Sequence, residues 1–270
     1  MKKTSLIWGT LILFLFFFPI FVNGIPSGST AKAPKLVKDS SYMVYAANIM
    51  EEEPVQVAGG KALLYFTHSR EAFEPVTEAK NGIIAANHQT ENITKFGEKL
   101  KTQLIFNGVA TEILPIDNEL EMNKKGINYG RAYKAIRPFV EKRLQEENYD
   151  LIIDLHRDSV GPDKSTMVYN NEKYAKVAFV IGMEHPNFEK NRANATLLKK
   201  EMELLVPGIT RDLVMKHGAG VDGKYNQDLH PGLLVVELGG IGNKEDELNR
   251  TVAVIAKAAA AVIDNSTRVE

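Results

Sequence analysis

The sequence predicts an α/β domain with a mainly parallel central sheet flanked by helices on both faces. Apolar runs of strand length alternate along the chain with segments whose apolar residues recur every three or four positions, the spacing of a helix face. The run from Tyr149 to Leu155 shows no regular alternation of apolar and polar residues, as expected for a strand that is covered on both faces. Strands and helices that alternate in this way favour a parallel sheet.

The expected elements follow one another in a regular order. The strands are expected at Lys61–Thr67, Thr111–Ile116, Tyr149–Leu155, Ser165–Val168, Lys176–Ile181, Leu213–Met215 and Leu233–Glu237. The helices are expected around Ile93–Leu104, Tyr129–Leu144, Asn187–Leu205 and Leu248–Val262. Asn107-Gly108 ends the first helix, because glycine suits a left-handed cap. We expect a loop after the first strand, and an antiparallel pair formed by the fourth and fifth strands through Asn170-Asn171.

The first 24 residues are predicted to be a signal peptide or a membrane anchor. A short basic start, Met1-Lys2-Lys3, precedes an almost wholly apolar run from Leu6 to Val22, which is the layout of a secretory signal and is close to the minimum length of a membrane span. Residues 25–41 are predicted to be a flexible linker, since they are rich in Pro, Gly, Ser, Lys and Ala. Residues 42–270 are predicted to be one α/β domain, which is exported and either held at the outer face of the membrane or secreted.

The composition excludes several classes of function. The chain has no cysteine, which rules out disulfides, a thiolate nucleophile and cysteine-bound zinc. Its 33 basic and 34 acidic residues give a net charge of −1, so nothing indicates nucleic acid as a partner. Neither Ser69 nor Ser159 lies in a G-x-S-x-G motif, so a serine-nucleophile hydrolase is disfavoured.

Three chemistry-bearing side chains lie where expected strands end. His68 follows the first strand, His156 the third, and Glu237 the last. In open α/β sheets, ligands bind outside the carboxyl ends of the strands, so these side chains are predicted to share one site. Two imidazoles and a carboxylate, with a fourth position open to water, form a catalytic zinc arrangement.

The carboxylates near the two histidines have more than one interpretation. Glu71 faces the same point as His68 if the chain turns at Ser69, and could then bind zinc; otherwise it is a carboxylate favoured at a helix N-terminus. Asp154 or Asp158 could hold the second nitrogen of His156, or either could form an ion pair with Arg157.

Glu237 follows four apolar residues, so burial should raise its pKa into the range of a general base. It could instead be a residue that only terminates its strand and caps the following helix. The other histidines are expected in surface loops, away from any metal: His88, His185, His217 and His230.

Four motifs together resemble the stage II sporulation protein P family of spore-forming Gram-positive bacteria, in the same order, from about Lys61 to Asp264. The motifs are Tyr65-Phe66-Thr67-His68-Ser69-Arg70-Glu71-Ala72-Phe73, Asp154-Leu155-His156-Arg157-Asp158-Ser159, Tyr225-Asn226-Gln227-Asp228-Leu229 and Val236-Glu237-Leu238-Gly239-Gly240. The resemblance implies a fold similar to zinc-dependent N-acetylmuramoyl-L-alanine amidases, with peptidoglycan as substrate and Zn²⁺ as cofactor. It implies that His68 and His156 bind zinc, that Glu71 is the carboxylate ligand, and that Glu237 is catalytic.

The expected function is therefore a zinc amidase that removes stem peptides from glycan strands during sporulation-related septal wall remodelling. Arg157 could stabilise the developing oxyanion, hold a substrate carboxylate, or form a structural ion pair. The resemblance implies stage II sporulation proteins D and M as partners, although the family usually has a longer region between the membrane segment and the catalytic domain. The alternatives are an endopeptidase that cuts cross-links with the same site, and a wall-binding scaffold without turnover.

Overall fold

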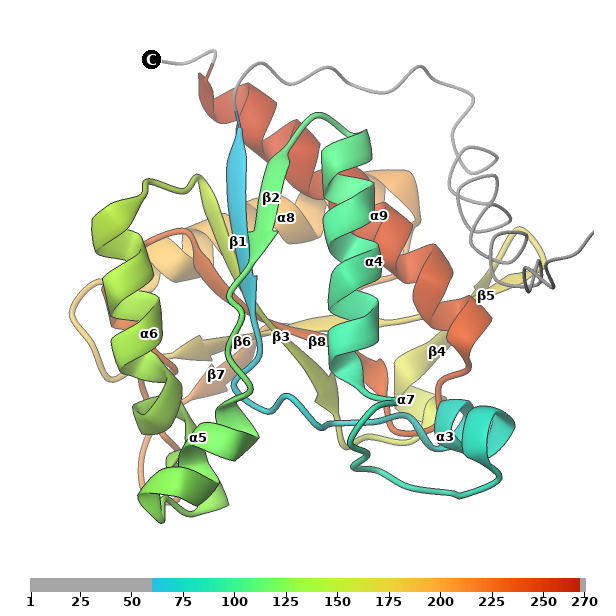
Figure 1. The fold of residues 1–270 in the computed structure, drawn as a ribbon. Coiled ribbons are helices and arrows are strands. Elements are labelled where there is room, and N and C mark those ends of the chain that lie inside the picture. Colours follow the sequence, from blue (N-terminus) through green and yellow to red (C-terminus); the bar gives the residue numbers. More distant parts are fainter. Residues whose placement is uncertain (1–59, 268–270) are drawn as a thin grey trace, which may run out of the picture. The chain divides into compact units, whose positions relative to one another are not determined.

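A computed structural model describes residues 60–267, with side chains as far as residue 265. The central sheet contains six strands in the order β2-β1-β3-β8-β6-β7. Their bounds are β1 Lys61–Tyr65, β2 Ala110–Ile113, β3 Leu151–Asp158, β6 Val177–Gly182, β7 Val214–Lys216 and β8 Leu233–Gly240. Strands β8 and β6 pair antiparallel, while every other neighbouring pair is parallel (Figure 1). The predicted mainly parallel sheet is confirmed.

The strand register places the chemistry-bearing residues at one edge of the sheet. Tyr65, the last residue of β1, pairs with Asp154 of β3. Two residues further along β3, His156 pairs with Glu237 of β8. On its other side Glu237 faces Ala178 of the antiparallel strand β6. Because β1, β3 and β8 run in the same direction, their carboxyl ends bring residues from three distant parts of the chain together.

Helices cover both faces of the sheet, as predicted. One face carries α4 (Ile93–Phe106), α9 (Glu245–Thr267) and α8 (Phe188–Leu205), with α9 in contact with both of the others. The opposite face carries α6 (Ala132–Glu146), visible to the left of the sheet in Figure 1. The helix α6 contributes Ile136 and Val140 to a buried cluster with alternate residues of the strands, among them Leu63, Tyr65, Ile152, Leu233 and Val235. This alternation follows from the two-residue period of side chains along a strand.

The predicted pairing of Ser165–Val168 with Lys176–Ile181 is wrong. Asn170 and Asn171 do form the turn, and both adopt positive φ, of 49° and 65°, which asparagine tolerates in tight hairpins. The hairpin they close joins β4 (Thr166–Tyr169) to β5 (Glu172–Ala175) as a separate two-stranded sheet. The next run, β6, is fully buried and enters the central sheet instead.

Several short helices lie where only loops were expected. The segment after β1 contains α3 (Glu74–Asn81), which begins with a proline in its first turn and ends at Gly82 in a left-handed conformation. Helix α5 (Asn118–Lys125) is capped by Asp117, whose side chain accepts the Leu120 N–H. The remaining ones are α7 (Pro162–Ser165) and η2 (Gln227–Leu229). The short helix η1 (Tyr129–Arg131) forms the start of the helix expected at Tyr129–Leu144 and precedes α6.

The N-terminal predictions lie outside the described residues. They concern the signal or anchor at 1–24, the linker at 25–41 and the domain boundary at residue 42. Among the helices of residues 60–267, none combines the length and the apolar character that a membrane crossing requires.

The packing of α4 on β1 gives a test of the fold. A Cβ added at Gly97 of α4 would lie 2.2 Å from Cζ of Phe66, a buried ring just beyond β1. We expect Gly97→Ala to lower the free energy of unfolding by about 1–3 kcal/mol through overpacking, although the same change ordinarily stabilises a helix by roughly 0.5–1 kcal/mol. Urea denaturation measures it.

A matched control is Gly130→Ala, since a Cβ there meets no atom closer than 3.7 Å. It should leave stability nearly unchanged, and shortening the ring in a Gly97→Ala/Phe66→Leu double variant should recover part of the loss. Unchanged or increased stability in Gly97→Ala alone would contradict this packing.

Candidate metal and catalytic site

His68 and Glu71 lie on one turn that begins just beyond β1. The Glu71 N–H donates to the carbonyl oxygen of His68 at 3.2 Å, which closes the turn. Ala72 N–H then donates to the Ala86 carbonyl, fixing the chain against the loop that follows α3. The two side chains can therefore approach the same point, as the sequence predicted.

Asp154 connects this turn to His156. Its carboxylate is fully buried and accepts hydrogen bonds from the Thr67 N–H (2.9 Å) and the Thr67 hydroxyl (2.6 Å). The oxygen that accepts the Thr67 N–H, Oδ1, also lies 3.1 Å from Nε2 of His156. Because Thr67 directly precedes His68, one carboxylate holds both the backbone that carries the first imidazole and the ring of the second.

The choice between Asp154 and Asp158 is thus decided in favour of Asp154. Asp158 forms an ion pair with Arg211 instead, and its Oδ1 accepts the Val160 N–H. Neither aspartate pairs with Arg157 through its side chain in the contacts of residues 60–267.

The two imidazoles and Glu71 form a compact group. The rings of His68 and His156 lie 5.4 Å apart, centroid to centroid. Glu71 Oε2 lies 3.4 Å from His156 Nδ1 and accepts the Arg157 N–H at 2.9 Å. Thus Nε2 of His156 faces Asp154 while Nδ1 faces Glu71, the orientation in which a carboxylate fixes the outer nitrogen of a metal-binding imidazole.

The charge states of the group follow from burial and from these partners. Burial, aided by the nearby His156, lowers the pKa of His68 to about 4, so its imidazole is neutral near pH 7. Although burial opposes a charge on His156, the Asp154 and Glu71 carboxylates raise its pKa well above the usual value. Burial also opposes the charge of Glu71, yet its hydrogen bond to His156 gives the carboxyl a lowered pKa.

The donor set fits a zinc ion. A neutral imidazole, a second imidazole and an ionised carboxylate are zinc ligands, each at about 2.0–2.2 Å. Nδ1 of His68 is shielded from solvent and finds no hydrogen-bond partner among residues 60–267, so no protein group competes with a ligand for this nitrogen. Within that same range, no three histidine or acidic side chains are already spaced to hold an ion. In this arrangement a proton on His156 lies between its ring and Glu71. Zinc would replace that proton on binding.

Glu237 lies beside this group on the neighbouring strand. Its Oε2 is shielded from solvent and without a hydrogen-bond partner in the described part of the chain. Burial raises its pKa to about 7, a shift that the charge on His156 opposes and the Glu71 carboxylate supports. A carboxyl group with a pKa near neutrality can both accept and release a proton.

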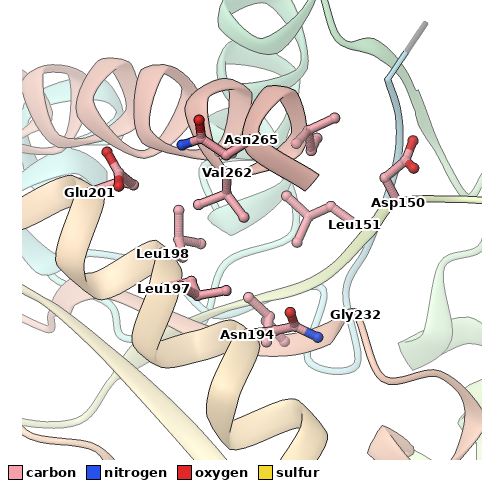
Figure 2. Close-up of a pocket in the computed structure, with 12 residues that line it drawn as sticks. Asp150, Leu151, Asn194, Leu197, Leu198, Glu201, Gly232, Val262 and Asn265 are labelled. Atoms are coloured by element: carbon pink, nitrogen blue, oxygen red, sulfur yellow. The ribbon is translucent and has the colours of Figure 1, made fainter. Parts of the chain in front are cut away.

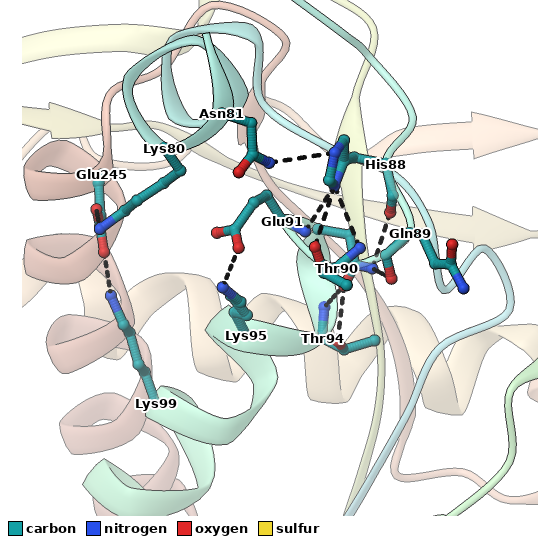
Figure 3. Close-up of polar contacts among 11 residues, drawn as sticks. Lys80, Asn81, His88, Gln89, Thr90, Glu91, Thr94, Lys95, Lys99 and Glu245 are labelled. Carbon is teal, nitrogen blue, oxygen red and sulfur yellow. Dashed lines mark hydrogen bonds and ion pairs between the residues drawn. The ribbon is translucent and has the colours of Figure 1, made fainter. Parts of the chain in front are cut away.

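Arg157 is held by backbone rather than by acidic side chains. Its Nη2 donates to the Ala86 carbonyl at 2.9 Å and its Nη1 to the Asp158 carbonyl at 3.2 Å. Ala86 belongs to the loop between α3 and α4, which His88 stabilises from inside. Nδ1 of His88 accepts the N–H groups of Thr90 and Glu91, and its Nε2 contacts the Asn81 amide, as Figure 3 shows.

Two tyrosines, to which the sequence patterns gave no role in the site, enclose the imidazoles. Tyr129 stacks on His68 with ring centroids 4.0 Å apart, and Tyr133 stacks on His156 with its hydroxyl 3.4 Å from Nε2. Both lie within the helix expected at Tyr129–Leu144, and helical spacing predicts packing but gives neither ring a role in the site. The ring of Tyr225 packs edge-on against the ring of Tyr133, with centroids 5.0 Å apart.

The Tyr225–Leu229 motif therefore acts as a support for the site. Asn226, in a left-handed conformation, donates its amide to the Tyr133 carbonyl. Asp228 receives two hydrogen bonds from Arg137 of α6, and Gln227 bonds to the backbone of β6 through Gly182 and Val180. These contacts fix α6, and with it Tyr133, relative to the sheet.

The remaining histidines lie apart from the group. The prediction that His185 is a surface residue is wrong, because only 6% of it is exposed, next to Phe188. His230 accepts the Gly232 N–H through Nδ1, and His217 is exposed in its loop.

Comparison with solved structures finds three similar chains, each at low sequence identity and with a TM-score below 0.5. An amidase from Clostridioides difficile, CwlD in complex with the lipoprotein GerS, is 12% identical, with coverage of 78% of this chain and 97% of that one and a TM-score of 0.49. The N-acetylmuramyl-L-alanine amidase Ami1 from Mycobacterium smegmatis is 10% identical, with coverage of 78% and 99% and a TM-score of 0.41. A metallo-carboxypeptidase from Burkholderia cenocepacia is 12% identical, with coverage of 84% and 70% and a TM-score of 0.44.

Sequence comparison gives a more specific result. The model of the stage II sporulation protein P family matches residues 29–260. The protein of that name from Bacillus subtilis (strain 168) is 36% identical over 212 residues, which is 77% of this chain. The chain spans about half of that relative, 53% of its length. The site described above thus lies within the matched region, and the chain belongs to the stage II sporulation protein P family.

Proposed function

We propose that this chain is a zinc-dependent N-acetylmuramoyl-L-alanine amidase, which hydrolyses the amide between the lactyl group of muramic acid and L-alanine in peptidoglycan. The observation that carries the proposal is the convergence of His68, Glu71 and His156, with Glu237 in register beside His156. Membership of the stage II sporulation protein P family supports a role in wall remodelling during sporulation. Zinc, when bound, would polarise the scissile carbonyl and lower the pKa of the attacking water to about 7.

The residues of the chain would then have separate tasks. Glu237 takes a proton from the attacking water and delivers it to the leaving amine, which its near-neutral pKa permits. Asp154 keeps the outer nitrogen of His156 occupied, so that Nδ1 is the nitrogen directed at the ligand position. Arg157, anchored by two carbonyl groups beside Glu71, supplies positive charge for the developing oxyanion or for a substrate carboxylate.

We also propose that the domain acts outside the cell membrane, retained there by its apolar N-terminal segment, Leu6–Val22. Peptidoglycan is the expected partner, together with other sporulation wall-remodelling proteins such as stage II sporulation proteins D and M. A septal hydrolase gains from confinement at the membrane, because tethering raises its local concentration at the wall. Mass analysis of the natively expressed protein tests retention, since a mature chain that begins at Ile25 would show a cleaved signal.

Mass spectrometry of digested muropeptides tests the reaction itself. The zinc-loaded protein should release free stem peptides that begin with L-alanine, and a chelator should abolish their release. Peptide fragments cut within the cross-link would identify an endopeptidase, and an unchanged digest would identify a binding protein without turnover. Either result would overturn the amidase proposal.

The ligand roles are tested by metal content. His68→Ala and His156→Ala should each lose bound zinc and activity, because a site with two protein ligands holds zinc weakly. His230→Ala is the matched control, since His230 only accepts a backbone N–H outside the site, and it should bind zinc normally. Full zinc content in His68→Ala would remove that residue from the ligand set.

Glu237→Gln separates catalysis from metal binding. The amide keeps the size of the side chain but cannot accept the proton, so turnover should fall about 10²–10⁴-fold. Zinc content, measured by elemental analysis, should remain that of the unmodified protein. If zinc disappears together with activity, Glu237 is a ligand and the base lies elsewhere.

Asp154→Asn tests the carboxylate behind His156. Loss of its charge should weaken zinc binding by roughly 10–100-fold, measured by competition with a chromophoric chelator. Asp158→Asn is the control, because Asp158 pairs with Arg211 and not with an imidazole. Equal zinc affinities for the two variants would show that Asp154 has no part in orienting the ligand.

A further inference from the structure

A cavity lies at the edge of the sheet opposite the candidate site. It has a volume of about 520 Å³ and is bounded by α8, α9 and the first residues of β3 and β8. Figure 2 shows Leu197, Leu198 and Val262 directed into it, with Asn194 and Glu201 at its rim. His156 lies five residue steps along β3 from Leu151, which lines the cavity, a distance of roughly 16 Å along the strand. The cavity is therefore separate from the candidate site.

The apolar lining continues onto the open surface of α8. Leu197 is 50% exposed and Leu204 is 68% exposed, and a separation of seven residues places both on the same face of the helix. A cavity that continues into exposed apolar residues on one helix marks a surface that a further apolar segment can cover.

The chain itself enters the described structure at the mouth of this cavity. The Lys61 N–H donates to Oδ2 of Asp150 at 2.8 Å, and the Asp150 N–H donates to the Lys61 carbonyl at 2.9 Å. Asp150 lines the cavity, and Figure 2 shows it beside the beginning of β1. Lys61, at the beginning of the described chain, therefore lies at the rim of the cavity.

The preceding sequence contains a segment suited to fill it. Tyr45–Met50 reads Tyr-Ala-Ala-Asn-Ile-Met, with no charged residue and three large apolar side chains. Nine residues separate Met50 from Gly60, and they include Glu51-Glu52-Glu53 and Gly59. Such a connection reaches up to roughly 30 Å, which is ample for a cavity whose rim contacts Lys61.

We propose that Tyr45–Met50 of the same chain docks into the cavity between α8 and α9, with Ile49 and Met50 against Leu197 and Leu198. The acidic connection suits the solvated surface around the cavity, whereas Tyr45–Met50 gains by leaving water. The catalytic domain then begins before β1, and its N-terminal connection is fixed at the edge of the sheet away from the candidate site.

Cross-linking tests the contact directly, because the natural chain has no cysteine. In the full chain, Ile49→Cys is combined with Leu197→Cys and treated with a short bismaleimide at low protein concentration. The matched control pairs Ile49→Cys with Leu120→Cys, a similarly exposed position on α5. Docking predicts an intramolecular cross-link that forms about ten-fold faster in the first pair, since contact raises the effective concentration.

Each other outcome overturns the proposal. Equal cross-linking rates for the two pairs would show that Tyr45–Met50 has no preferred binding position on the domain. The absence of a cross-link in both pairs would show that the segment does not bind in the cavity. Cross-linked dimers through Leu197→Cys would show that a second copy occupies the cavity.

A thermodynamic cycle provides an independent measurement. Ile49→Asp and Leu197→Asp should each lower the midpoint of urea unfolding of the full chain, and the double variant should lose less than the sum, because one contact is lost only once. Ile49→Asp with Leu120→Asp should be additive. Additivity in both cycles would overturn the contact.

Discussion

The geometry of the site depends on a single buried carboxylate. Asp154 is fully buried, and an ionised group in that position is costly unless each of its oxygens has a partner. Its partners are the backbone and hydroxyl of Thr67 and the ring of His156. The need to satisfy one charge therefore fixes the position of the residue before His68 and the orientation of His156 together. The spacing between the two imidazoles, whose rings meet edge-on at 5.4 Å, follows from this constraint.

The placement of the site could be predicted from sequence because parallel strands leave little choice. Runs of buried residues that end in His68, His156 and Glu237 meet at one edge once β1, β3 and β8 pair in the same direction. The choice between Asp154 and Asp158 could not be made, since in a regular strand both share a face with His156. The register shifts between His156 and Asp158, and this local irregularity turns Asp158 toward Arg211.

Other features depend on contacts between distant segments. Asn170-Asn171 predicts a hairpin correctly. Because β5 is short and begins with polar residues, the sequence pattern favours the more apolar β6 as the partner of β4. Helix α3 has a proline in its first turn and few buried residues, so its sequence resembles a loop. The roles of Tyr129 and Tyr133 were hidden because a tyrosine on a helix face is indistinguishable, in one sequence, from a residue that merely packs.

The two outer strands of the sheet have a consequence for association with other chains. Strand β2 has four residues and β7 has three, so each leaves only a short row of unpaired backbone groups. Glu112 of β2 is held by Arg143 of α6 through two hydrogen bonds, and β7 ends in Lys216. Short, charged outer strands resist edge-to-edge association with other chains. Short, charged outer strands thus protect this cysteine-free domain from aggregation without covalent cross-links.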